Sequence, residues 1–270
     1  MTRPIRIGVH LWPGGAPDYA TWREAVLRAE ELGADAIFGY DHFHLPAVRR
    51  VPTGVALEPV QPDVVNFEGW TALASWAEIT SSAEIGLLVT GIGYRNPELL
   101  ADMARTVDHI SGGRVILGVG AGYYEKDYAV YGWDYGTVRS RMDLFADGLR
   151  RIEHRLENLI PKPLRQIPLL VGGAGERRTL PLVGRYAHIW HSTMDVETFR
   201  RKNDLVKQHA AAAGRDDGAI ERACTWLDPA RSDALLAEGV TLHIAEVKPT
   251  NAGYDLTALK AALAWRDTVR

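Results

Sequence analysis

Apolar residues recur along this chain in two kinds of pattern. Short runs, several of them apolar on both faces like strands of a helix-covered parallel sheet, are separated by longer amphipathic segments of helical period. The runs are Ile7–Leu11, Ala36–Tyr40, Ile85–Val89, Val115–Val119, Leu169–Val171, Ile189–Trp190, Cys224–Leu227 and Val240–Ile244. The pattern predicts eight strand–helix units.

Capping residues mark several of the expected helices. Asp18 precedes an apolar stripe that ends at Gly33, and Asn96 with Pro97 opens a helix that ends at Gly112–Gly113. Two further stripes are Met142, Phe145, Leu149, Ile152 and Leu156, and Leu256, Leu259 and Leu263 after Asp255. These segments have the spacing of helices that bury one face.

Eight such units in 270 residues predict an α/β fold of the (β/α)8 TIM-barrel type, which typically needs about 250 residues. A doubly wound sheet is the alternative. It would normally carry a glycine fingerprint after its first strand, where this chain has Trp12–Pro17. No linker divides the sequence, so we expect residues 1–270 to form one domain.

Two segments at the expected C-terminal mouth of the barrel are too long to be simple connectors. Residues 43–67 contain four prolines and follow the second strand, which is typical of a functional lid. Residues 123–135 follow the fourth strand and are rich in tyrosine and tryptophan. These rings either pad the barrel rim or form a wall for a large planar ligand.

Composition excludes several classes of protein. A formal net charge of -3 offers no field for nucleic acid or an anionic membrane. The lone Cys224 excludes an internal disulfide and a multi-cysteine zinc cage. The N-terminus, Met1–Pro4, shows no signal region, and no apolar stretch is long enough for a bilayer. We therefore expect a cytoplasmic protein that binds neither nucleic acid nor membrane.

Polar residues gather where the predicted strands end, which is where TIM barrels carry their chemistry. They are His10, Asp41, His42, His44, Thr90, His191, Ser192 and His243. Asp41 beside His42 suits proton transfer or hydride chemistry, because a carboxylate sets the orientation and protonation of an imidazole. A metal-dependent hydrolase built on Asp41, His42 and His44 is the alternative. We expect no metal, since the first strand lacks paired histidines and the last lacks a ligand aspartate.

Glycine-rich turns follow the fourth and fifth strands, at Gly118–Gly122 and Gly172–Arg178. Neither matches a dinucleotide or P-loop motif. Without side chains, such turns let backbone N–H groups approach an anion, and Arg177 and Arg178 favour phosphate at the second turn. The alternative is that the glycines only make tight turns.

Seven short motifs in order and spacing resemble the bacterial-luciferase-like superfamily, in particular its coenzyme F420-dependent oxidoreductases. They are Tyr40–His44, Asn66–Trp70, Gly86–Thr90, Tyr94–Pro97, Ile110–Arg114, Gly118–Glu125 and Gly172–Arg178. The resemblance covers Ile5 to about Ser192. It implies a TIM barrel that binds a flavin-type ring at its mouth and a homodimer acting on a small-molecule substrate.

The resemblance also implies roles for individual residues. Asp41 and His42 would lie beside the deazaflavin ring, with His42 stabilising charge or moving a proton during hydride transfer. The strand end that includes Leu88 and Thr90 corresponds to one that carries a non-proline cis peptide behind the ring. The cofactor tail would be held by Gly120, Gly122, Gly172, Gly173, Gly175 and Arg178.

One departure concerns the residue after the fourth-strand glycines. Sugar-phosphate-oxidising members carry a glutamate there, whereas this chain has Tyr123, with Glu125 two residues later. That difference argues against sugar-phosphate oxidation. We expect hydride transfer between F420 and a small organic substrate. The alternatives are an FMN-dependent luciferase-like monooxygenase and a cofactor-binding protein without turnover.

Overall fold

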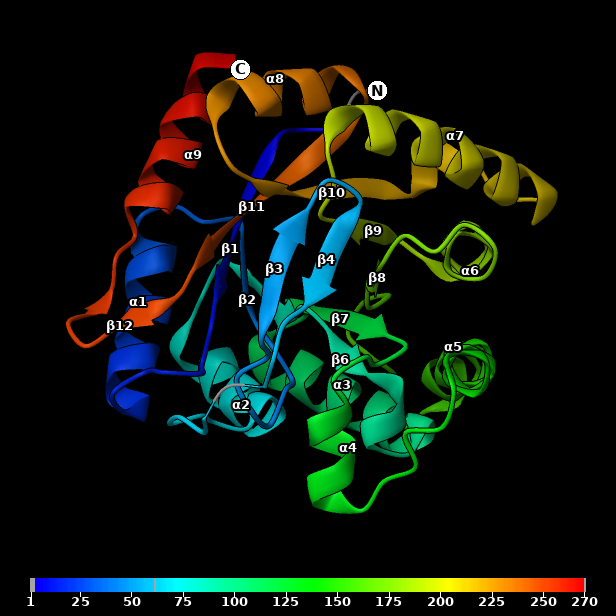
Figure 1. Ribbon diagram of the computed structural model, residues 1–270, viewed down its shortest axis with the longest axis horizontal. Coiled ribbons are helices and arrows are strands. Elements are labelled where there is room, and N and C mark those ends of the chain that lie inside the picture. Colours follow the sequence, from blue (N-terminus) through cyan, green and yellow to red (C-terminus); the bar gives the residue numbers. More distant parts are fainter. Residues whose placement is uncertain (1–2, 61, 270) are drawn as a thin grey trace.

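A closed barrel of eight parallel strands, ringed by helices, forms the centre of the computed structural model, which describes residues 3–60 and 62–269 (Figure 1). Neighbours in the barrel follow chain order, and pairing of β5 with β7 closes the ring. The barrel strands are β1 (Arg6–Leu11), β2 (Ala36–Gly39), β5 (Glu84–Leu87), β7 (Val115–Gly120), β8 (Leu169–Gly172), β9 (Ile189–Ser192), β10 (Glu221–Trp226) and β11 (Val240–Val247). This confirms the predicted barrel and excludes the doubly wound sheet.

Helices follow the strands and cover the outside of the barrel (Figure 1). They are α1 (Tyr19–Glu31), α2 (Gly69–Ile79), α3 (Pro97–Ser111), α5 (Val138–Asn158), α6 (Thr179–Tyr186), α7 (Val196–Ala212), α8 (Pro229–Ala237) and α9 (Thr257–Val269). None of the helices in the described part of the chain has the length and apolarity to cross a membrane. Met1 and Thr2, where the expected leaderless N-terminus begins, lie outside the described residues.

The predicted capping residues begin their helices. The Asp18 carboxylate accepts a hydrogen bond from the Thr21 N–H over 2.7 Å. The Asn96 side chain accepts from the second and third N–H groups of α3, and Gly112 ends that helix with a φ of +69°. Because these contacts are local, the sequence alone predicts them.

Two apolar clusters form the core. One fills the barrel interior and includes Phe38, Ile116, Leu170 and Leu242. The larger one lies between the strands and the surrounding helices. The barrel is therefore packed solid through its middle, and space for a ligand remains at its C-terminal mouth.

The two long segments of the sequence form additional elements outside the barrel. The first contains an antiparallel hairpin of β3 (Val48–Val51) and β4 (Gly54–Leu57). Its turn is tied across the barrel, because the Pro52 carbonyl accepts a hydrogen bond from the Asp195 N–H over 2.9 Å at the start of α7. The second segment contains α4 (Glu125–Tyr131). The remaining short elements are β6 (Thr90–Gly91), β12 (Pro249–Thr250), β13 (Gly253–Tyr254) and the 3-10 turns Ile92–Tyr94 and Asp217–Ala219.

Candidate functional site

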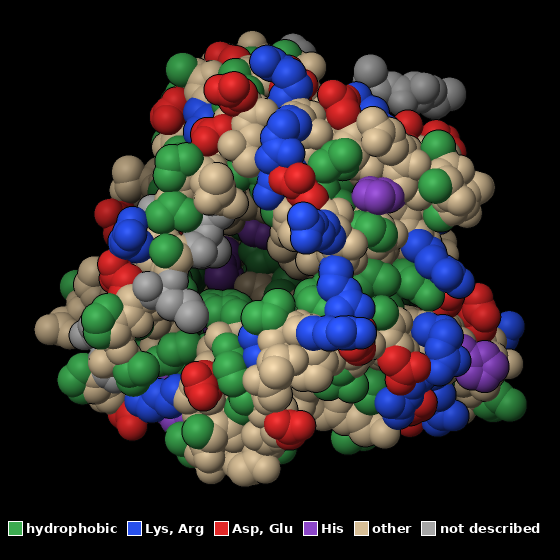
Figure 2. Space-filling view, turned by 45° about the vertical axis from the view of Figure 1, so that its right-hand side comes forward, with side chains coloured by type: hydrophobic (Ala, Val, Ile, Leu, Met, Phe, Trp, Pro, Cys, Tyr) green, Lys and Arg blue, Asp and Glu red, His purple; other side chains and the backbone are tan. Residues whose placement is uncertain are grey.

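A cavity of about 900 Å³ opens among the C-terminal ends of the barrel strands. Its walls include His10 of β1, Gly172 of β8 and Glu246 of β11, and the β3–β4 hairpin adds Val48 and Arg49. Figure 2 shows the opening, with hydrophobic side chains along its rim and histidine visible in its depth. A cavity of this size is typical of small-molecule and cofactor sites.

His42 lines this cavity, and its ring forms a hydrogen bond with Asp127 of α4. His42 Nδ1 lies 2.7 Å from Asp127 Oδ2. The same fully buried carboxylate contacts His44 Nδ1 at 2.8 Å and accepts from the Tyr94 hydroxyl at 2.8 Å and the Phe43 N–H at 3.2 Å. Asp127 therefore has four polar neighbours, two on each oxygen.

These contacts assign the tautomer of the His42 ring, that is, which ring nitrogen carries the hydrogen. Burial alone would raise the pKa of Asp127, but hydrogen bonds from His42, His44 and Tyr94 outweigh it and lower that pKa below its ordinary value. An ionised carboxylate only accepts hydrogen bonds, so the facing nitrogen of His42 carries the proton. In the neutral ring, Nε2 is then the nitrogen with a free electron pair.

Asp41 does not orient His42 as the sequence predicted. It is buried against Arg95, whose Nη2 lies 3.1 Å from Asp41 Oδ1, and it is absent from the described lining of the cavity. Burial raises the pKa of Asp41, with the Arg95 charge opposing that shift. The carboxylate that contacts the His42 ring is instead that of Asp127, which sequence reasoning missed.

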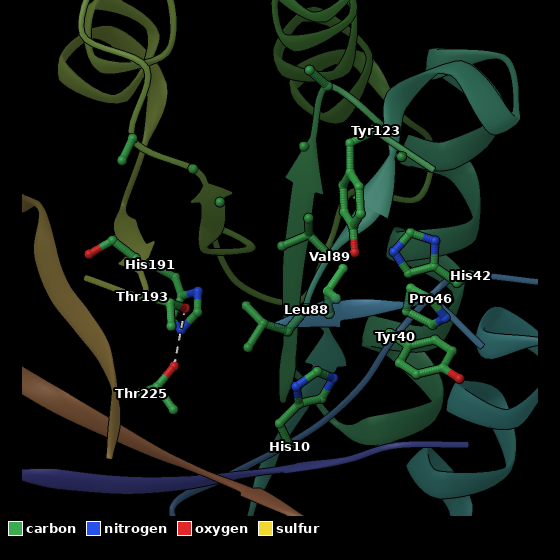
Figure 3. Close-up of a pocket in the computed structure, with 18 of the residues that line it drawn as sticks. His10, Tyr40, His42, Pro46, Leu88, Val89, Tyr123, His191, Thr193 and Thr225 are labelled. Atoms are coloured by element: carbon green, nitrogen blue, oxygen red, sulfur yellow. Dashed lines mark hydrogen bonds between the residues drawn. The ribbon is translucent and has the colours of Figure 1, made fainter. Parts of the chain in front are cut away.

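Leu88 and Val89 line the cavity just beyond β5 (Figure 3). The peptide bond between them is cis, as the resemblance implied. Figure 3 shows the pair between an aromatic wall and a more polar wall. The aromatic wall includes Tyr40, His42 and Tyr123, and the polar wall includes His191, Thr193 and Thr225.

Val89 also explains glycines at the ends of β7 and β8. A Cβ atom at Gly120 would lie 2.8 Å from Val89 Cγ2, and one at Gly172 would lie 3.1 Å from Val89 Cγ1. A Cβ at Gly120 would therefore clash with Val89, and one at Gly172 would require Val89 to move by a few tenths of an ångström. Gly120, Gly122, Gly172, Gly173 and Gly175 all line the cavity, where the resemblance placed the cofactor tail.

Besides Asp41, two further predicted cofactor residues lie outside the described lining of the cavity. Thr90 is fully buried, and its hydroxyl accepts a hydrogen bond from Trp70 Nε1 over 3.0 Å. Arg178 forms an ion pair with Asp143 of α5. Neither belongs to the described lining of the cavity.

Lys202 of α7 is a lining residue that the sequence interpretation missed. Its side chain is buried, and its Nζ donates to the Ala174 carbonyl over 2.9 Å. The buried stripe of α7 also contains Phe199, Val206 and Ala210. A lysine at helical spacing within that apolar stripe was the signal that could have revealed it.

Tyr123 completes the wall next to His42. The two rings are edge to face with centroids 5.1 Å apart, and the Tyr123 hydroxyl points toward Val89 in Figure 3. Glu125 begins α4 and is not among the described lining residues.

Within residues 3–60 and 62–269, no three His, Cys, Asp or Glu side chains are grouped to hold a metal. The metal-hydrolase alternative therefore has no ligand cluster in this region.

A family model described as luciferase-like monooxygenase matches residues 4–227. The chain belongs to this family. Together with the barrel, membership in the luciferase-like family supports an oxidoreductase.

Three proteins illustrate what the chain is similar to. A phthiodiolone/phenolphthiodiolone dimycocerosates ketoreductase of Mycobacterium tuberculosis is 28% identical over 221 residues, which cover 73% of this chain and 58% of that protein. An F420-dependent secondary alcohol dehydrogenase, solved with an F420–acetone adduct, aligns with a TM-score of 0.82 at 17% identity, over 99% of this chain and 100% of that one. The oxygenating component of a Pseudomonas putida Baeyer–Villiger monooxygenase was solved with FMN. It aligns with a TM-score of 0.63 at 16% identity, over 88% of this chain and 72% of that one.

Proposed function

We propose that the chain is an F420-dependent oxidoreductase that moves a hydride between the deazaflavin and a small alcohol or its carbonyl counterpart. The observation that carries the proposal is His42 in the cavity with Nδ1 fixed by Asp127. This arrangement supplies a proton-transfer group beside an apolar surface formed by Leu88 and Val89. The F420–acetone complex of the similar alcohol dehydrogenase supports the choice of cofactor and reaction.

The residues of the cavity fit a planar ring that carries a phosphorylated tail. Leu88 and Val89 offer one apolar face for the ring. Gly120 and Gly172 lack side chains that would obstruct the tail, and Lys202 supplies a cation close to the Gly172–Gly175 turn. When bound, the deazaflavin supplies the ring carbon that accepts or releases hydride.

His42 would handle the proton that accompanies the hydride. In alcohol oxidation, Nε2 accepts the hydroxyl proton while the hydrogen on the carbinol carbon leaves as hydride, giving a carbonyl compound. Asp127 stabilises the imidazolium so formed, because its negative charge lies 2.7 Å from Nδ1. In the reverse direction the same nitrogen returns the proton to the carbonyl oxygen.

An FMN-dependent monooxygenase is the second candidate. The family model that matches the chain is described as luciferase-like monooxygenase, and the similar Baeyer–Villiger component was solved with FMN. The apolar surface of Leu88 and Val89 suits a flavin ring as well as a deazaflavin ring. Lys202 suits the phosphate of either cofactor.

Titration of the purified protein with F420 and with FMN tests both candidates. We expect F420 to bind, and alcohols to bleach the oxidised cofactor. His42→Ala should bind F420 normally and lose turnover, whereas His154→Ala, an exposed position on α5, should match wild type. Tight FMN binding with substrate-dependent oxygen uptake would establish the monooxygenase instead. Binding of neither cofactor would exclude both.

A further inference from the structure

Tyr123 carries a hydroxyl that the protein leaves available in the cavity. The residue belongs to the cavity lining, and its ring lies edge to face with that of His42, with centroids 5.1 Å apart. Among the residues that the structure describes, none forms a hydrogen bond with this hydroxyl, and the bond that Tyr123 does accept uses its backbone carbonyl. Figure 3 shows the hydroxyl directed into the space beside Val89. It is therefore in position to bind a ligand.

The other two tyrosines of the described lining use their hydroxyls within the protein. The Tyr40 hydroxyl donates to the Asn66 side chain over 3.0 Å. The Tyr94 hydroxyl donates to the Asp127 carboxylate over 2.8 Å. These two bonds hold the wall together, whereas the hydroxyl of Tyr123 takes no part in it. Tyr123 is thus the tyrosine of this lining whose hydroxyl remains for a ligand.

The backbone around Tyr123 is fixed by two hydrogen bonds. The Tyr135 hydroxyl donates to the Tyr123 carbonyl over 2.9 Å, and Arg141 Nε of α5 donates to the Gly122 carbonyl over 3.1 Å. The Arg141 guanidinium also lies over the Tyr135 ring, 3.8 Å from its centroid, so each contact supports the other. A side chain whose backbone is already fixed loses little freedom when it binds a ligand. The Tyr123 hydroxyl is therefore pre-organised.

The electrostatics of the site keep this hydroxyl protonated. Loss of hydration raises the pKa of Tyr123 above its ordinary value, and the charge of Asp127 adds to the shift. The hydroxyl is therefore a neutral hydrogen-bond donor at physiological pH. Beside it, Asp127 occupies Nδ1 of His42 and leaves Nε2 for a ligand. The wall thus offers a ligand oxygen one group that exchanges a proton and one that donates a hydrogen bond.

We propose that the Tyr123 hydroxyl binds the substrate oxygen on which His42 acts and stabilises the negative charge that develops there. This rests on the proposed function, because it assumes hydride transfer between F420 and an alcohol or carbonyl compound. In reduction, the hydride adds to the carbonyl carbon and His42 gives its proton to the oxygen. Tyr123 donates a hydrogen bond to that oxygen and keeps its own proton. In oxidation, the alcohol oxygen accepts the same bond while its proton passes to His42.

Tyr123→Phe tests this role, because it removes the hydroxyl and keeps the ring against His42. The probes are acetone and cyclohexanone with reduced F420, and 2-propanol and cyclohexanol with oxidised F420. Turnover should fall by about 10²- to 10³-fold in both directions, the usual effect of removing one donor to a developing oxyanion.

Ketone binding should respond much less than turnover. With oxidised F420 in place no hydride can move, so fluorescence of the cofactor reports binding of the ketone alone. Tyr123→Phe should weaken this binding by about two- to tenfold, because a hydrogen bond to a neutral carbonyl contributes little. The difference between the two effects identifies stabilisation of charge, since a general disturbance of the site would not produce it.

Two further variants serve as controls. Tyr131→Phe removes a hydroxyl from the same aromatic segment, at a position that is 50% exposed and outside the described lining. It should match wild type in turnover and in ketone binding. Replacing Tyr123 with 4-aminophenylalanine keeps an N–H donor on the ring and should restore part of the lost turnover. The affinity for F420, measured by fluorescence titration, should be the same in all of these proteins.

The results separate this inference from the proposed function. If Tyr123→Phe turns over like wild type, or loses turnover and ketone binding in equal measure, the hydroxyl does not stabilise the developing charge. If the variant instead binds F420 more weakly, the hydroxyl contacts the cofactor and not the substrate. Each of these results overturns the inference and leaves the proposed function standing. If wild type binds F420 but acts on none of the four probes, both proposals are overturned.

Discussion

His42 Nδ1 lies 2.7 Å from a carboxylate oxygen of Asp127, a residue 85 positions away in the chain. His42 follows β2, whereas Asp127 belongs to α4 in the segment after β7. His42 therefore comes from one strand–helix unit, and the carboxylate that contacts its ring comes from another. The aromatic segment 123–135 thus contributes Tyr123 to the described cavity lining and Asp127 to the contact with His42.

We predict that Asp127→Asn lowers turnover by about 10²- to 10⁴-fold, the usual contribution of a positioned acid–base group. The amide occupies the same space but removes the charge that stabilises the protonated ring. The expected change is in kcat, with cofactor affinity close to wild type, measured by steady-state kinetics and by titration with F420.

Asp63→Asn is the matched control for that variant. Asp63 is also an aspartate near the mouth, but its side chain is 68% exposed and pairs with Lys126. Turnover should therefore be unaffected. Full activity in Asp127→Asn would show that the carboxylate has no part in proton handling.

The sequence predicted features that local contacts decide. Asp18 and Asn96 cap helices within three residues of themselves, and the apolar runs could be assigned as strands because both of their faces are buried. The partner of His42 could not be read in this way. In extended chain, neighbouring side chains point to opposite sides, so Asp41 turns to Arg95 while its neighbour faces the cavity. Asp127 and Lys202 reach the site through tertiary packing, which spacing along the chain does not reveal.

Arg95→Met should strongly destabilise the fold. It leaves the fully buried Asp41 carboxylate without its guanidinium partner, and breaking a buried pair on one side typically costs about 3–5 kcal/mol. Urea unfolding followed by circular dichroism measures the loss. Arg155→Met, which breaks the exposed pair with Asp102, should unfold at nearly the wild-type urea concentration. Equal midpoints for the two variants would contradict a structural role for Arg95.

The contact between Val89 and Gly120 can be tested by a double-mutant cycle. A Cβ at residue 120 would lie 2.8 Å from Val89 Cγ2, so Gly120→Ala should cost about 1–3 kcal/mol of unfolding free energy by overpacking. Val89→Ala removes the opposing methyl groups, and the added Cβ should then be tolerated. We expect the double variant to be more stable than the sum of the single changes. Strict additivity would mean that Gly120 is required for another reason.

His243 should make the protein sensitive to acid. It is fully buried and packs edge to face on Trp265, with ring centroids 4.6 Å apart. Burial lowers the pKa of His243 from 6.5 to about 4. In the unfolded chain His243 therefore takes up a proton near pH 6.5, whereas in the folded protein it takes up a proton only near pH 4. The contribution of His243 to the free energy of unfolding is therefore fully present above pH 6.5 and decreases as the pH drops toward 4.

His243→Phe removes the titrating group while keeping an aromatic ring against Trp265. Between pH 7.5 and pH 4.5, the unfolding free energy of wild type should fall relative to the variant by about 2–3 kcal/mol, measured by urea titrations at each pH. His154→Phe, at an exposed position on α5, should track wild type throughout. Comparing differences between variants removes the contribution of other acid-sensitive groups, since these are common to all three proteins. A difference that does not vary with pH would show that protonation of His243 is not coupled to unfolding.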